Sequence, residues 1–189
     1  MNAQTGPLIL RLTILGLVLS VMQVAAVSQL TIFGTNVDLL PLVVAAVGLL
    51  CGSLTGAVFG FAVGLFIDTA LVQTLGLSSL VYVVAGYGAG RLRELRDPQA
   101  ALVPMAVGAG ATAIATIGYS VLQFLLGVDA PISLLLLRQV LITIIVNTLV
   151  AYPVYALTRR VLLPALPEDP RRRRRRAYAT GGLSPLSRS

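Results

Sequence analysis

The residues of this chain that could carry chemistry are few and widely spaced. The sequence has no histidine and no lysine, which excludes histidine bases, histidine metal ligands, Schiff-base lysines and phosphate-loop lysines. Its single cysteine, Cys51, lies inside an apolar run, so no disulfide can form within the chain, and we expect a reduced thiol buried in lipid. The acidic residues are dispersed, and no nucleophile stands near a base. We therefore expect no catalytic site, no metal and no cofactor, and we expect that the protein is not an enzyme.

A row of glycines is the most specific pattern in the sequence. It consists of Gly48, Gly52, Gly56, Gly60 and Gly64, and Asp68 continues the four-residue spacing. Residues four apart lie near one face of a helix, with a drift of about 40° at each step. The row is therefore a stripe without side chains, on which another backbone can approach closely. The pattern predicts tight packing within a helix bundle, and we add the hypothesis that a partner's helix packs on Gly52, Gly56, Gly60 and Gly64.

Four polar residues stand in or beside apolar runs, where an unpaired charge is costly. Asp38 precedes Leu39-Leu40-Pro41 and fits a helix N-cap, whereas Asp68 either caps the next turn or has a functional role. Arg138 lies roughly 12 Å from the outer end of its predicted helix. We expect that it pairs with Asp68 or Asp38, or that its side chain extends outward to water. Asn147 is expected to form hydrogen bonds between helices.

The elements that position these residues must be membrane-spanning helices. Hydrophobic residues make up 57% of the 189-residue chain and charged residues only 11%, which excludes a soluble globular enzyme, a disordered chain and a fibrous protein. Charges, prolines and polar clusters divide the apolar runs into six predicted helices, and the long run from Leu39 to Ile67 divides at Gly52-Ser53. The six helices are Leu8–Val27, Asp38–Leu50, Leu54–Thr69, Leu75–Gly90, Leu102–Leu126 and Ile132–Leu157.

The arginines predict how these helices are oriented. Cytoplasmic loops are rich in arginine, so the loop that begins at Arg91 and the tail after Arg159 should both lie inside. With six helices the N-terminus is also inside, and every arginine except Arg138 lies on the inner side; a five-helix chain would place Arg11 outside. We therefore predict an all-α integral membrane protein of the bacterial cytoplasmic membrane. Residues 1–163 form its six-helix transmembrane domain, both termini are cytoplasmic, and the first helix is retained rather than cleaved.

The C-terminal segment, residues 164–189, has a different composition. It contains the six consecutive arginines Arg171, Arg172, Arg173, Arg174, Arg175 and Arg176. We predict a disordered cytoplasmic tail. Arginines beside an anionic leaflet contribute about 1 kcal/mol each, so we expect the six to contact inner-leaflet lipids. Nucleic-acid binding is the rival interpretation, but neither an aromatic row nor a folded basic domain supports it.

The order of several motifs resembles that of a known family. Val37-Asp38-Leu39-Leu40-Pro41 is followed by Gly52-x3-Gly56-x3-Gly60-Phe61-x2-Gly64-Leu65-x2-Asp68, and then by Tyr82 and Gly86-Tyr87-x2-Gly90. This order resembles MreD, the family of rod shape-determining membrane proteins, over most of the predicted transmembrane domain. Val37 is a departure, because the family often has proline before the aspartate. The arginine tail is not a hallmark of the family.

The resemblance implies a non-catalytic subunit of the bacterial cell-elongation (rod) complex. Such a subunit binds MreC, a single-span protein with a large extracytoplasmic domain. Together they help to regulate cell shape and peptidoglycan synthesis by a RodA-type glycosyltransferase and a penicillin-binding transpeptidase. The resemblance also implies a bundle similar in fold to the S component of energy-coupling-factor transporters.

The alternative interpretation is a true S component, which binds a vitamin from outside for transport. Such proteins typically carry an Ala-x3-Ala row on the first helix, where this chain has Gly16-x3-Ser20. Its outer loops also hold few aromatic or polar side chains that could grip a ligand. A lipid flippase or carrier would need a hydrophilic cavity, which the sequence does not show.

Overall fold

The computed structural model describes residues 5–25, 31–32, 35–36, 38–95, 102–127 and 134–165. Its elements, in chain order, are α1 (Thr5–Ala25), β1 (Thr31–Ile32), β2 (Thr35–Asn36), α2 (Leu40–Cys51), α3 (Ser53–Ala70), α4 (Leu77–Leu95), α5 (Leu102–Leu125), α6 (Leu134–Leu162) and the short 3₁₀ turn η2 (Leu163–Ala165). The six predicted helices are confirmed, including the division at Gly52. The two-residue strands, which pair antiparallel with Thr31 opposite Asn36, were not predicted. The arginine tail lies outside the described residues.

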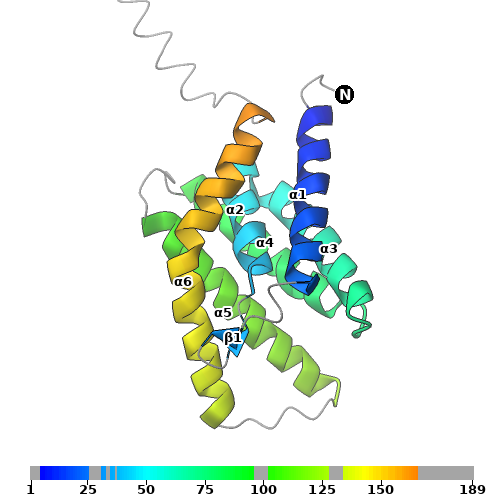
Figure 1. The fold of residues 1–189 in the computed structure, drawn as a ribbon, viewed down its shortest axis with the longest axis vertical. Coiled ribbons are helices and arrows are strands. Elements are labelled where there is room, and N and C mark those ends of the chain that lie inside the picture. The colour runs from blue at the N-terminus through cyan, green and yellow to red at the C-terminus, as the bar shows by residue number, and fades with distance from the viewer. Residues whose placement is uncertain are drawn as a thin grey trace, which may run out of the picture.

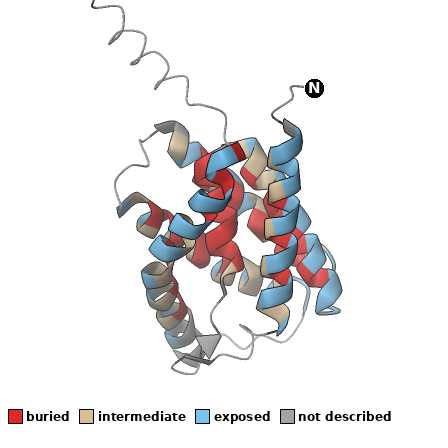
Figure 2. Cartoon of the chain, turned by 45° about the horizontal axis from the view of Figure 1, so that its top comes forward, coloured by how far each residue is buried: buried red, intermediate tan, exposed pale blue. Residues whose placement is uncertain are grey.

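The shortest helix, α2, lies at the centre of the bundle (Figure 1). All of its residues from Leu40 to Leu50 are buried, and it contacts each of the other five helices. A helix surrounded by other helices must be apolar on every side, which explains why its sequence shows no polar face. Its 12 residues extend only about 18 Å, less than the roughly 30 Å of a bilayer's hydrocarbon core. Figure 2 shows the buried residues concentrated in this middle region.

The outer helices carry the apolar surface expected of a protein in lipid. Four of them, α1, α3, α5 and α6, are long and apolar enough to cross a membrane. On α1, for example, Ile9, Leu10, Ile14 and Leu17 are each more than half exposed. Extended apolar surface of this kind is rare on soluble monomers, so the fold is consistent with a membrane protein. The helix α4, which is not among these four, carries Arg91 and Arg93 near its end.

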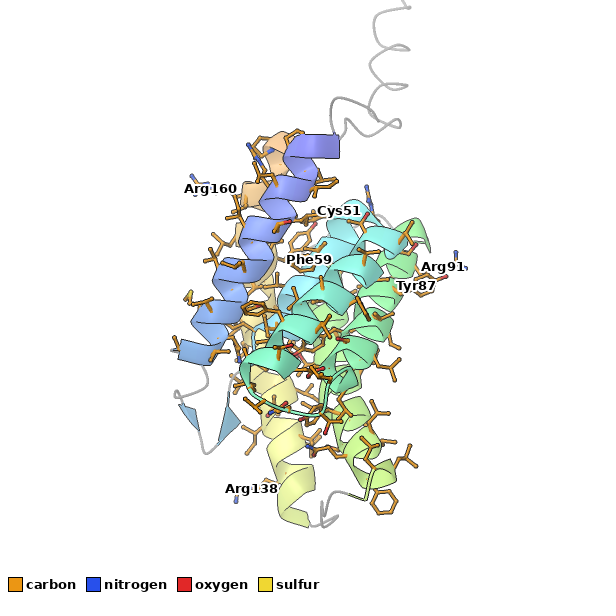
Figure 3. All side chains as sticks on the ribbon, turned by 90° about the vertical axis from the view of Figure 1, so that its right-hand side faces the viewer. Cys51, Phe59, Tyr87, Arg91, Arg138 and Arg160 are labelled. Atoms are coloured by element: carbon orange, nitrogen blue, oxygen red, sulfur yellow. The ribbon has the colours of Figure 1, made fainter. Side chains whose placement is uncertain are left out.

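The two ends of the helical chain lie at the same end of the bundle. The first turns of α1 and the last turns of α6 are adjacent, and Arg11 Nη1 donates a hydrogen bond to the Val161 carbonyl at 2.9 Å (Figure 1). Arg91 and Arg160 also lie at this end, whereas Arg138 lies at the opposite end (Figure 3). An odd number of helices would separate the two termini. The placement of these arginines is the asymmetry on which the predicted orientation depends.

Candidate functional site

The glycine row lies where the backbones of α2, α3 and α4 pass closest to one another. A Cβ atom on Gly56 would lie 2.6 Å from the carbonyl oxygen of Gly86 and 2.7 Å from the Cα of Gly48. The contact is reciprocal, because a Cβ on Gly86 would meet the carbonyl of Gly56. Neither neighbour is the end of a flexible side chain, so neither can move aside without moving a helix. Glycine at these positions is what allows three helices to cross at backbone contact.

Farther along α3, the row continues against α4 of the same chain. A Cβ on Gly60 would meet the Tyr82 carbonyl, and one on Gly64 would meet the backbone of Ser79. The hypothesis that a partner's helix packs on Gly52, Gly56, Gly60 and Gly64 is therefore corrected for the last three positions. Their smooth face is already covered by the backbone of α4, at Gly86, Tyr82 and Ser79 in turn.

Gly52 has a different role from the rest of the row. Its φ of +101° lies in the region that favours glycine, and it separates α2 from α3. The nearest side-chain atom to a Cβ added at this position would be Arg93 Nη1, at 3.8 Å, so space is not the constraint here. Gly52 is required by the backbone turn that lets a central half-length helix continue into an outer one.

Asp68, at the far end of the row, caps the next helix. Its side chain is fully buried. Oδ2 accepts a hydrogen bond from the Gly76 amide at 2.8 Å, and both carboxylate oxygens accept from the Ser78 amide at 3.2 and 3.3 Å. Because α4 begins at Leu77, this carboxylate satisfies N–H groups at the positive end of that helix. The sequence left open whether Asp68 caps the next turn or has a functional role, and these contacts show the cap.

A second group of polar side chains meets at the N-terminal end of α2. We call Asp38, Tyr82, Thr112 and Asn147 the buried polar cluster. Asp38 Oδ1 accepts from the Leu40 amide at 3.1 Å, and Oδ2 accepts from the Tyr82 hydroxyl at 3.3 Å. Asn147 is fully buried, and its Nδ2 donates to the Asp38 carbonyl at 2.9 Å and to Thr112 Oγ1 at 3.2 Å. The cluster therefore joins the start of α2 to α4, α5 and α6.

The helix start at α2 differs slightly from the prediction. The N-cap position is Leu39, with Pro41 in the first turn, so Asp38 lies one residue earlier than expected. Its carboxylate still accepts a hydrogen bond from a first-turn amide. Asp38 therefore satisfies the helix end from outside the cap position.

Arg138 does not make the expected ion pair in the described part of the chain. Its side chain is exposed and points away from the bundle (Figure 3). Asp38 and Asp68, the two proposed partners, are instead held by backbone amides and a tyrosine hydroxyl. The outward extension considered as the alternative describes Arg138 better, because local donors satisfy both carboxylates.

Comparisons with family models, curated proteins and solved structures found no match to this chain. The site is therefore interpreted from its own geometry. Within the described ranges, no group of three or more cysteine or acidic side chains is placed to hold a metal ion. The arrangement consists of close backbone packing along the glycine row and buried polar contacts beside it.

The sequence did not reveal the polar contacts of two cluster members, the Tyr82 hydroxyl and Thr112. The Thr112 hydroxyl donates to the Gly108 carbonyl at 2.9 Å, one turn earlier on α5. Threonine commonly bonds to its own helix in this way, so its presence in an apolar helix gives little warning of a contact to another helix. The sequence does place two polar residues, Thr112 and Asn147, inside consecutive apolar helices, and this could have suggested a contact between them.

Proposed function

We propose that this chain is a non-catalytic membrane subunit of a bacterial cell-elongation (rod) complex, of the kind that the MreD resemblance implies. The observation that carries the proposal is where the resembling motifs lie in the fold. Residues 38–41, 52–68 and 82–90 lie on the three neighbouring helices α2, α3 and α4 and at the start of α2, and their glycines are backbone contacts between these helices. The motif residues therefore support the proposal by having a common role in packing these helices.

In this proposal the chain acts as a rigid platform in the cytoplasmic membrane. The glycine contacts fix α2, α3 and α4 against one another, and the capped start of α4 adds to this rigidity. Both termini face the cytoplasm, where the arginine-rich end of the bundle and the tail contact anionic lipids. No reaction is assigned to the chain, since Asp38 and Asp68 are engaged in holding helix ends.

The partner in this proposal is an MreC-type single-span protein. Because α4 covers the glycine row, the partner's helix must contact the outer apolar surface of the bundle instead. Through this partner the chain would influence a RodA-type glycosyltransferase and a penicillin-binding transpeptidase. Bulky substitutions at Gly56 or Gly60 would not test partner binding, because they would first separate α3 from α4.

The experiment that tests the proposal is co-purification combined with a scan of the outer surface. Four outward-facing residues on different helices are suitable for tryptophan substitution: Ile14, Phe61, Ile117 and Leu149. We expect the single-span partner to co-purify with the wild type and to be lost from one variant, while all four variants elute as folded protein. Co-purification of transport ATPase subunits instead would favour the S component. Retained partner in all four variants would contradict docking on these faces.

A further inference from the structure

The helix α6 leaves more of its surface uncovered than the other helices of membrane length. In its most apolar stretch only 17% of the residues are buried, against 22–39% in α1, α3 and α5, and it lies at the edge of the bundle (Figure 1). Its inward face carries the buried polar residues Thr143, Asn147 and Thr158. Its outward face carries apolar side chains that are 49–68% exposed, namely Leu141, Ile145, Leu149 and Tyr152. Their spacing of three and four residues is the one with which a helix packs along a single neighbouring helix.

Arg138 continues this outward face toward the outer end of α6. It precedes Leu141 by three residues, which places both on one side of the helix, and its exposed side chain points away from the bundle (Figure 3). Among the described residues it makes neither an ion pair nor a hydrogen bond. The stretch from Arg138 to Arg159 extends about 32 Å along the helix, close to the thickness of a bilayer's hydrocarbon core. Arg138 therefore lies at the outer boundary of that core.

The charge of Arg138 requires an anion at this boundary. The helix begins at Leu134 and helical side chains lean toward the N-terminus, so the partial positive charge of the helix end adds to that of the guanidinium. Asp38 and Asp68 are held by backbone amides and a tyrosine hydroxyl. The negative surface potential of a membrane belongs to its cytoplasmic leaflet, at the other end of the bundle. A carboxylate on another polypeptide fits this position.

We propose that the single-span partner docks along the outward face of α6 and carries a carboxylate at the outer end of its membrane helix, opposite Arg138. We call this face the α6 stripe; it consists of Arg138, Leu141, Ile145, Leu149 and Tyr152. The inference rests on the proposed function and adds to it the docking face and the chemistry of the partner. A single span of about 20 residues is about 30 Å long and matches the stripe. Its apolar side chains supply the packing, and the ion pair fixes the depth and direction of the partner's helix.

Photo-crosslinking of the full chain in its native membrane tests the docking face. A photoreactive amino acid replaces Ile145 in one variant and Phe61 in the matched control, because Phe61 is similarly exposed but lies on α3. We expect position 145 to form a covalent adduct with a single-span protein and position 61 to form none, with the crosslinked peptide identified by mass spectrometry. An adduct from position 61 alone would overturn the α6 stripe and leave the proposed function standing. Failure of any single-span protein to co-purify with the wild type would overturn the proposed function itself.

Charge reversal tests the ion pair. Arg138→Glu should lower the amount of co-purified partner by about tenfold, because two carboxylates would then face each other, whereas Arg138→Lys should keep most of it. Since the side chain is exposed, both variants should elute as folded protein. Replacing the partner's facing carboxylate, located from the crosslinked peptide, by arginine should restore recovery with Arg138→Glu. Equal recovery with Arg138→Glu and with the wild type would overturn the ion pair, and bound phospholipid lost from Arg138→Glu instead would identify a lipid phosphate as the anion.

Discussion

Replacing Gly86 by alanine should destabilise the bundle, whereas the same change two residues later should not. A Cβ on Gly86 would lie 2.7 Å from the carbonyl carbon of Gly56, with the carbonyl oxygen closer still, whereas a Cβ on Gly88 meets nothing within 4 Å. Ordinary contact begins at 3.4 Å, so α3 and α4 must separate by at least 0.7 Å. A gap of that size removes roughly a quarter to a half of each contact across the interface, at about 0.1–0.2 kcal/mol per atom pair.

With a few tens of atom pairs affected, the loss is about 2 kcal/mol, within the range measured for overpacked cores. Alanine returns about 1 kcal/mol of helix propensity at either position. We therefore expect Gly86→Ala to lower the free energy of unfolding by about 1 kcal/mol and Gly88→Ala to raise it by a similar amount. Reversible denaturation of each variant in detergent, followed by circular dichroism, measures both values. Equal stabilities for the two variants would refute the backbone contact between α3 and α4.

Two further predictions concern the cap of α4 and the orientation of the bundle. Asp68→Asn should lower the free energy of unfolding by about 1–3 kcal/mol, because an amide cannot replace the buried carboxylate that accepts from Gly76 and Ser78. The same denaturation assay checks it, and an unchanged stability would contradict the capping role. In a chain whose native cysteine is replaced by serine, Arg138→Cys should react with a membrane-impermeant maleimide in intact cells, and Arg160→Cys only after permeabilisation. The reverse pattern would invert the proposed orientation.

The helices were predictable from sequence because their signals are local. Apolar runs and their interruptions located all six helices, and Gly52 marked the break between α2 and α3. The largest errors at the ends were at α4, which continues to Leu95 rather than stopping at Gly90, and at α6, which continues to Leu162 rather than stopping at Leu157. Arginines end the apolar run at both places, but arginine and leucine are good helix formers, so each helix continues past them.

The contacts between helices were less predictable. The glycine row indicates that some helix packs closely on it, but the spacing does not say which helix. The spacing of Gly56 and Gly60 indicates close approach, but only the fold shows that α4 of this chain makes it. For Arg138, the sequence predicted a pair with Asp68 or Asp38. The sequence could not show that the backbone amides of Gly76 and Ser78 already donate hydrogen bonds to Asp68.

The most direct test of the proposed function is to identify the chains that leave the membrane with this protein. The full chain is tagged, extracted from its native membrane in mild detergent, and the associated polypeptides are identified by mass spectrometry. The account predicts a single-span protein with a large extracytoplasmic domain in stable association, together with a membrane glycosyltransferase or a penicillin-binding transpeptidase. Purification of this chain alone, or with the ATPase subunits of a transporter, would contradict it.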